Sequence, residues 1–187
     1  MPQTAQKVPY GYEPPEARTR GSLIYYDSFE HATDEELDAA AATAEARSFS
    51  RIVFYPIHEE TMRRMSKQPI GAYYKREKRL QEWKRDRGLD DVEIDGWEGK
   101  RKKYTPIDSA LRHLTETLPA PHFLYLTPDM ATAFASFSSF GDWIGRIRLI
   151  LSGMPAELHP QLERRRDRWE IGVRPAVTDF HESDTVF

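Results

Sequence analysis

The sequence contains no cysteine among its 187 residues. This absence excludes disulfide bonds and cysteine-based zinc sites, and it fits a cytoplasmic protein. No run of about 18 apolar residues occurs, so no membrane-spanning helix is predicted. Residues 1–21 lack the apolar core of a signal peptide. The net charge of −3 argues against a generic nucleic-acid-binding protein, because such proteins carry an excess of basic residues.

Glycine is missing from a place where α/β proteins often need it. The stretch SLIYYDSFEHATDEEL, from Ser22 to Leu37, joins an apolar segment to a predicted helix and contains no glycine. In α/β proteins such a junction usually holds phosphates on glycine-rich backbone and on the amides of the helix N-terminus. Here the junction carries five acidic residues instead: Asp27, Glu30, Asp34, Glu35 and Glu36.

The remaining pattern alternates apolar strands with helices. Buried strands are predicted at four short runs: 23–26, 51–55, 90–95 and 122–127. Helices are predicted over 34–46, 77–87 and 106–117, and from about Asp142. This alternation predicts an α/β domain over residues 21–187, built on a Rossmann-like parallel sheet with helices on both faces.

Other segments have weaker patterns. Residues 1–20 contain four prolines and are predicted to form a flexible arm, residues 57–75 a long loop, and residues 96–104 a basic turn. A Phe- and Ser-rich segment without assigned structure precedes Asp142. For three later segments the pattern indicates a helix end or a strand (147–152), a polar helix (160–170) and a last strand (171–177).

The segment from Thr33 to Glu36 has the pattern of a capping box, with Thr33 as the N-cap. Acidic residues in a first helical turn also interact favourably with the helix dipole. Helix capping therefore explains the acidic residues, while a Mg²⁺ site made of Asp27, Glu30 and Glu36 stays open as an alternative. The histidines show no metal-ligand spacing, so no other metal site is predicted.

Six segments, taken in order, resemble one enzyme family. YYDSFEHATDEE follows the first predicted strand, SRIVFYP ends a strand in Phe-x-Pro, and KREKRLQEW contains an Arg-Leu pair. KKYTPIDSALRHL contains a Tyr-Thr pair, FLYLTPD ends a strand near an aspartate, and SFGDWIGRI is rich in aromatic residues. Together they resemble the nicotinate-nucleotide adenylyltransferases of the HIGH-type nucleotidyltransferase superfamily, over roughly residues 22–151.

The resemblance implies a Rossmann-like fold with a small C-terminal helical part. It also implies adenylyl transfer from ATP to a mononucleotide, with Mg²⁺ as the cofactor of an active enzyme. Asp129 is expected to contact the ligand or to act as a helix N-cap. The ligand-binding candidates at matching positions are Ser28, Phe29, His58, Tyr104, Thr105, Asp129 and Trp143.

The chain departs from the family pattern G-G-[ST]-F-D-P-x-H-x-G-H at the positions that bind phosphate in that family. Tyr26 and Asp27 stand at the two glycine positions, and Thr33 and Glu36 stand at the two histidine positions. Side chains at the glycine positions obstruct the approach of a phosphate to the backbone, and carboxylates repel it. Thr33 and Glu36 are therefore interpreted as degenerate catalytic positions.

The sequence predicts a nucleotidyltransferase-like pseudoenzyme that binds a nucleotide or mononucleotide and catalyses weak or no adenylyl transfer. One alternative is an active nicotinate or nicotinamide mononucleotide adenylyltransferase of NAD biosynthesis, in which His31 or His58 replaces the missing histidines. The other is a non-catalytic interaction module. A homo-oligomer through exposed aromatic residues of the segment 134–143 is a further expectation, whereas no membrane and no specific nucleic acid are expected as partners.

Overall fold

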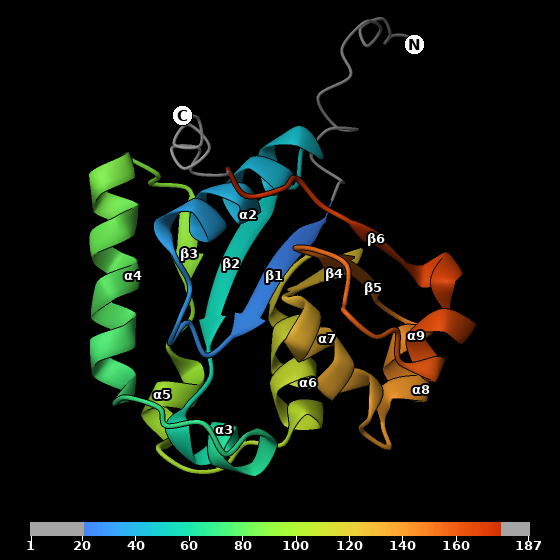
Figure 1. The fold of residues 1–187 in the computed structure, drawn as a ribbon. Helices are drawn as coiled ribbons and strands as arrows, with labels where there is room; N and C mark the ends of the chain where they lie inside the picture. Colours follow the sequence, from blue (N-terminus) through green and yellow to red (C-terminus); the bar gives the residue numbers. More distant parts are fainter. Residues whose placement is uncertain (1–20, 177–187) are drawn as a thin grey trace, which may run out of the picture.

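Six parallel strands form one sheet in the computed structural model, which describes residues 21–176 (Figure 1). The predicted Rossmann-like parallel sheet is confirmed, and its strands lie in the order β3-β2-β1-β4-β5-β6. The predicted arm, 1–20, and the end of the predicted domain, 177–187, lie outside the described residues. The strand bounds are β1 Ser22–Asp27, β2 Arg51–Pro56, β3 Val92–Ile94, β4 His122–Leu126, β5 Arg148–Leu151 and β6 Trp169–Ile171.

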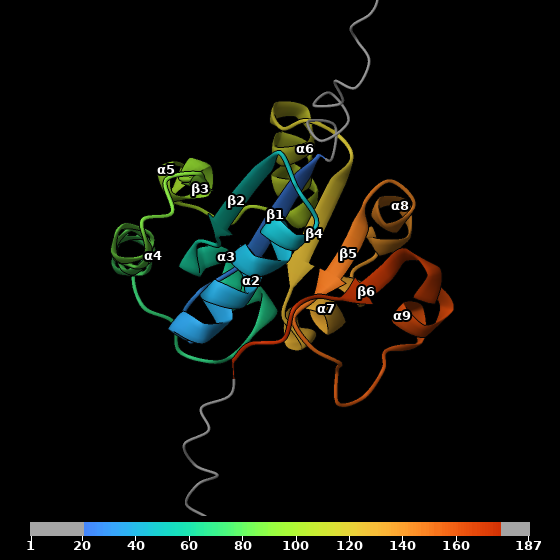
Figure 2. The same ribbon diagram turned by 90° about the horizontal axis from the view of Figure 1, so that it is seen from above.

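Helices cover both faces of the sheet (Figure 2). Helices α2 (Asp34–Ala46) and α4 (Tyr73–Arg87) pack on one face. The other face packs against α6 (Ile107–Thr117), α7 (Pro128–Ala135) and α8 (Phe140–Ile144). The remaining helical elements are α3 (Glu59–Met65), α5 (Trp97–Arg101), α9 (Pro160–Arg164) and a 3₁₀ turn (Arg166–Arg168). In the described chain no helix has the length and hydrophobicity needed to cross a membrane.

Burial of β1 on both sides explains its continuous apolar sequence. Ile24 and Tyr26 point into the core beneath α6 and α7, whereas Leu23 and Tyr25 point into the core beneath α2 and α4. Successive side chains of a strand alternate between the two faces, so a central strand needs apolar residues at every position. The apolar run therefore correctly predicts that β1 is buried on both faces.

The order of the strands creates one special position at the carboxyl edge of the sheet. From β1 the chain moves outward to β2 and β3, and it then returns to place β4 on the other side of β1. The two connections that follow β1 and β4 therefore diverge, and they leave a crevice between Asp27 and Leu126. Ligands of open α/β sheets bind at such a switch point.

The region 57–75 is not the long loop that the sequence predicts. It contains α3 and the start of α4, which begins at Tyr73 rather than Glu77. Neither helix starts with an ordinary capping residue. The imidazole of His58 accepts a hydrogen bond from a first-turn amide of α3, and Ala72 gives α4 no side-chain cap.

The second half of the chain contains more helix than predicted. The segment 96–104 contains α5 instead of a basic turn. The Phe- and Ser-rich segment contains α7, whose N-cap is Thr127 and not Asp129. Thr127 is followed by Pro128 at the first helical position, which is a recognisable start signal. Helix α8 begins at Phe140, earlier than the predicted start.

The end of the described chain completes the sheet. Residues 147–152 form strand β5 and not the end of a helix. The last strand, β6, lies before the predicted segment 171–177 and shares only Ile171 with it. Its first residue, Trp169, is buried and donates a hydrogen bond from Nε1 to the Leu162 carbonyl at 2.8 Å. Because the residues before Trp169 are polar, the sequence contains no apolar run that would indicate this strand.

The capping box of α2 gives a direct test of the local structure. The Glu36 amide donates to Thr33 Oγ1 at 3.1 Å, and the Thr33 amide donates to Glu36 Oε1 at 3.0 Å. We expect Thr33→Ala to lower the free energy of unfolding by about 1 kcal/mol, measured by urea denaturation. Thr117→Ala, which removes an exposed hydroxyl inside α6, should change it by less than about 0.5 kcal/mol. Equal effects would contradict the capping role.

Candidate functional site

A cavity of about 520 Å³ opens at the carboxyl ends of β1 and β4. It lies at the switch point of the sheet, between the first turns of α2 and α7 and the side of α3. Its charged lining consists of Asp27, Glu36 and Asp129, together with the imidazole of His31. No lysine or arginine of the described residues belongs to the lining. The position is that of a nucleotide crevice, but its charge is negative.

Asp27 is the most unusual of these carboxyl groups, because it is almost completely buried at the end of β1. The Phe29 amide donates to Asp27 Oδ2 at 2.8 Å. Burial raises the pKa of Asp27 to about 6; the Phe29 amide opposes this shift and the charge of Glu36 adds to it. At neutral pH the carboxyl group is mostly ionised, so it adds negative charge to the cavity.

Glu36 has two roles at once. Its carboxylate closes the capping box of α2 by accepting from the Thr33 amide, and it also lines the cavity. The first turn of α2 carries two further exposed acids, Asp34 and Glu35. The positive end of the helix dipole is therefore already matched by carboxylates of the protein itself.

Tyr26 does not block the cavity, contrary to the steric argument from the sequence. Its side chain is fully buried in the core beneath α6 and α7, where it stacks on Tyr55 with ring centroids 5.5 Å apart. It is not part of the cavity lining. Of the two residues that the resemblance aligns with glycines, only Asp27 lines the cavity.

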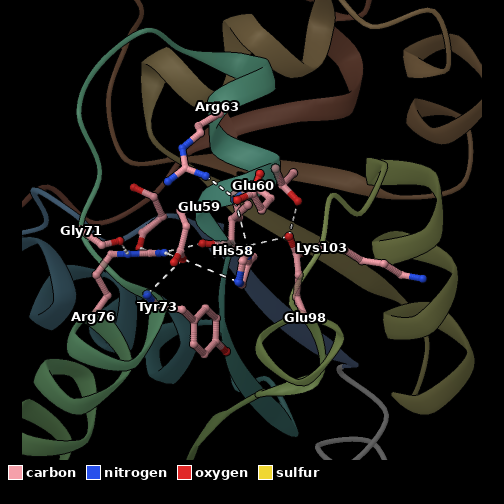
Figure 3. Close-up of polar contacts among 12 residues, drawn as sticks. His58, Glu59, Glu60, Arg63, Gly71, Tyr73, Arg76, Glu98 and Lys103 are labelled. Carbon is pink, nitrogen blue, oxygen red and sulfur yellow. Dashed lines mark hydrogen bonds and ion pairs between the residues drawn. The ribbon is translucent and has the colours of Figure 1, made fainter.

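Arg76 ties the loops around the cavity together (Figure 3). Its side chain is 5% exposed and donates to the carbonyls of Ser28 at 2.8 Å, Ile57 at 2.6 Å and Gly71 at 3.1 Å. It also pairs with Glu59 at 3.1 Å. These contacts use the guanidinium for structure, and Arg76 does not line the cavity, although its positive charge acts to lower the pKa of Asp27.

Glu98 forms a second buried polar centre, beneath α3 (Figure 3). Its carboxylate accepts from Tyr55 Oη at 2.6 Å, Thr61 Oγ1 at 2.5 Å and the His58 amide at 3.1 Å. Burial raises the pKa of Glu98, and these hydrogen bonds oppose the shift. Thr61 in turn accepts from the Thr105 amide at 2.9 Å. Through this chain of contacts Glu98 connects β2, α3 and the segment before α6.

A smaller cavity, of about 260 Å³, lies beside the first between α3, the start of α6 and the α7–α8 turn. Tyr104 lines it, with the guanidinium of Arg64 over its ring at 4.0 Å. Thr105 and Asp108 also line this cavity, and Asp108 accepts from Trp143 Nε1 at 2.8 Å. The arginine, the aromatic ring and the hydroxyl groups suit an anionic ligand with a flat ring, whereas the Asp108 carboxylate opposes one.

The sequence-predicted residues separate into three groups. Ser28, Glu36 and Asp129 line the larger cavity, and Tyr104 and Thr105 line the smaller one. The other candidates line neither cavity: Phe29, Thr33, His58 and Trp143.

The residues outside both cavities have structural contacts instead. Phe29 has a φ of +63°, which turns its ring into the core, where it stacks on Phe54 with centroids 5.6 Å apart. His58 is buried as the N-cap of α3, with its Nδ1 accepting from a backbone amide. Trp143 is buried and held by Asp108. Nothing in the sequence pattern separates such residues from ligand-binding ones.

The proposed Mg²⁺ ligands are not arranged around a common point. Glu30 accepts from the Gly71 amide at 2.9 Å and lies 3.8 Å from Arg76, whereas Glu36 is occupied by its capping box. Within residues 21–176 no group of three histidine or acidic side chains is placed to hold a metal ion. The residues present therefore do not fit a resident Mg²⁺ site.

The pKa of Asp27 predicts a distinct pH dependence. Because the folded-state pKa of about 6 lies above the ordinary value of 3.8, the protein binds this proton more tightly when folded. The stability that this proton gives is therefore lost as the pH rises through about 6. Compared with Asp27→Asn, the original protein should lose about 2.5 kcal/mol of unfolding free energy between about pH 4 and pH 7. Parallel stability curves for the two proteins would contradict the shift.

The buried guanidinium of Arg76 predicts a large loss of stability on its removal. Arg76→Met leaves three carbonyls and Glu59 without their buried donor, and we expect it to lower the unfolding free energy by about 3–5 kcal/mol. Arg85→Met, on the exposed face of the same helix, should cost less than about 0.5 kcal/mol. Urea denaturation of both variants measures the difference, and similar losses would contradict the role of Arg76.

Comparison with known proteins supports the fold. No protein-family model and no curated protein matches the sequence. Among solved structures, the chain is similar to the crystal structure of a "putative nicotinate-nucleotide adenylyltransferase" from Vibrio parahaemolyticus, with a TM-score of 0.53 and 16% identity. The match covers 78% of each chain. At this identity the likeness shows the fold alone: the chain has a Rossmann-like, nucleotidyltransferase-like α/β fold.

Proposed function

We propose that the chain is a nucleotidyltransferase-like protein that catalyses little or no adenylyl transfer. The observation that carries the proposal is the lining of the larger cavity, where Asp27, Glu36 and Asp129 face the space and no lysine or arginine of the described chain accompanies them. Nucleotidyl transfer depends on positive charge and on donors around the phosphates. A cavity with this lining repels a triphosphate.

The size of the effect is sufficient to abolish useful turnover. One pair of like charges about 4 Å apart costs roughly 1–4 kcal/mol, depending on the effective dielectric constant. Loss of one positioned donor to a reacting group lowers a rate by about 10²–10³. Against the family pattern, the sequence lacks both histidines and brings two further carboxylates, Asp27 and Glu36, to the cavity, so several such losses act together.

We propose the smaller cavity as the part that still binds a ligand, and we propose a mononucleotide as that ligand. Tyr104 offers an aromatic ring, and Arg64, whose guanidinium lies over one face of that ring, offers a positive charge. The structural neighbour bears the name of a nicotinate-nucleotide adenylyltransferase, which favours a pyridine mononucleotide over other candidates. A cytoplasmic location and a homo-oligomeric state belong to the same proposal, as does a connection to NAD biosynthesis.

An active enzyme with a rearranged site is the second candidate, and His31 favours it. This imidazole is exposed and lines the larger cavity. His58 is a poorer substitute, because it is buried and its Nδ1 accepts a backbone hydrogen bond. His31→Ala should abolish adenylyl transfer if the second candidate is right, and it should change nothing if the first is right.

Removing negative charge from the larger cavity tests the proposal directly. Glu36→Gln keeps the capping geometry, and Asp129 is exposed, so Glu36→Gln with Asp129→Asn should fold normally. We expect this double variant to bind ATP at least about tenfold more tightly than the original protein, as measured by calorimetry in Mg²⁺ buffer. The original protein should form no dinucleotide from ATP and nicotinate or nicotinamide mononucleotide.

The control is a second double variant that changes the net charge by the same amount at positions outside both cavities. Glu116→Gln with Glu157→Gln neutralises two exposed glutamates that line neither cavity, and it should leave ATP binding unchanged. Ordinary turnover by the original protein, or equal gains in the two double variants, would refute the proposal. Stabilisation by a mononucleotide in a thermal-shift measurement tests the smaller cavity separately.

A further inference from the structure

A third hollow, of about 860 Å³, exceeds both cavities of the carboxyl edge in volume. It lies at the opposite end of α2 from the cavity of about 520 Å³, called the larger cavity above. Its walls are the last turns of α2, the chain between α2 and β2, and the connection from α4 to β3. Helix α2 spans 13 residues, or about 20 Å, so this groove is well separated from the carboxyl edge of the sheet. We call it the α2–α4 groove, and it plays no part in the function proposed above.

The floor of the α2–α4 groove is the uncovered edge of a hydrophobic core. Ala41, Phe49, Ile52 and Leu89 line it, and each packs against the core cluster under α2 and α4 while remaining partly exposed. Both helices lie on this same face of the sheet (Figure 2). Grooves with an apolar floor of this kind bind apolar side chains of a partner.

The rim of the groove carries unmatched negative charge. Glu45, Asp90 and Asp91 are exposed, and none of them makes an ion pair within the described part of the chain. The one arginine of the lining, Arg87, is engaged by Asp38 through hydrogen bonds of 2.9 and 3.1 Å. An apolar floor inside an acidic rim is complementary to a segment with apolar residues on one side and basic residues beside them.

We infer that the α2–α4 groove docks a basic amphipathic segment of a partner protein. Apolar side chains of the segment cover Phe49, Ile52 and Leu89, and its lysines or arginines pair with Glu45, Asp90 and Asp91. The acidic rim disfavours nucleic acid and acidic peptides. The occupied groove leaves the cavities at the carboxyl edge open, so partner docking and mononucleotide binding are compatible.

A set of model peptides tests the inference on the full-length chain. The first probe is a fluorescein-labelled helical peptide of leucine and lysine, about four turns long, with the leucines on one face. One comparison peptide replaces leucine by serine and keeps the charge; the other replaces lysine by glutamate and keeps the apolar face. Fluorescence anisotropy should show the first peptide binding at least about tenfold more tightly than either comparison peptide.

Charge reversal in the groove locates the binding. Glu45→Lys with Asp91→Lys changes two exposed rim residues and should weaken binding of the leucine–lysine peptide at least about tenfold. Glu116→Lys with Glu157→Lys makes the same change of net charge away from the groove and should weaken binding less than about twofold. Hydrogen exchange should slow on peptide binding in residues 41–52 and 87–92.

Several results would overturn the inference. Equal weakening by the two double variants would mean general charge attraction, and equal binding of the serine–lysine peptide would mean that the apolar floor is not used. Absence of binding at about millimolar peptide would exclude a docking site of useful affinity. Complete displacement of the peptide by a small organic amine such as spermidine would indicate a small-molecule site instead. None of these results depends on whether the protein transfers adenylyl groups.

Discussion

Parallel pairing of β1 with β2 on one side and with β4 on the other is the constraint on which the rest of the structure depends. It brings the carboxyl ends of these strands to one edge, so the residues that follow β1 and β4 line the same cavity. Asp27 and Asp129 are far apart in the sequence and meet there for this reason. The helices on both faces of the sheet bury β1, so Tyr26 lies in the core and only Asp27 lines the cavity.

The negative charge of this cavity is partly a by-product of helix stability. Glu36 belongs to the capping box of α2, and the acids beside it suit the helix dipole. A phosphate-binding turn uses the same helix terminus for a ligand and keeps it free of carboxylates. The two uses exclude each other, because an anion at the terminus must compete with the protein's own acids. Asp27 adds a carboxyl group whose burial is unfavourable when it is charged.

The sequence predicts the sheet well because strands and long amphipathic helices depend on local patterns. The apolar runs of β1, β2 and β4 and the apolar stripe of α6 are visible without a structure. The short helices α3, α5 and α8 are not: α3 follows His58, and the N-cap residues of α5 and α8, Gly96 and Ser139, make no side-chain capping hydrogen bond. The start of α7 is visible in the sequence, because Thr127 precedes Pro128, although Asp129 is also an ordinary capping residue.

The polar centres of the site could not be predicted, because they join residues far apart in the chain. Arg76 binds carbonyls of Ser28 and Ile57, and Glu98 accepts from Tyr55; in the sequence neither differs from its charged neighbours. The net charge of the sequence likewise does not show where charged residues gather in the fold. A total of −3 conceals acids gathered at both ends of α2 and basic residues gathered at the end of α5. Recognition depends on that local charge, which only the packing of α2 against its neighbours defines.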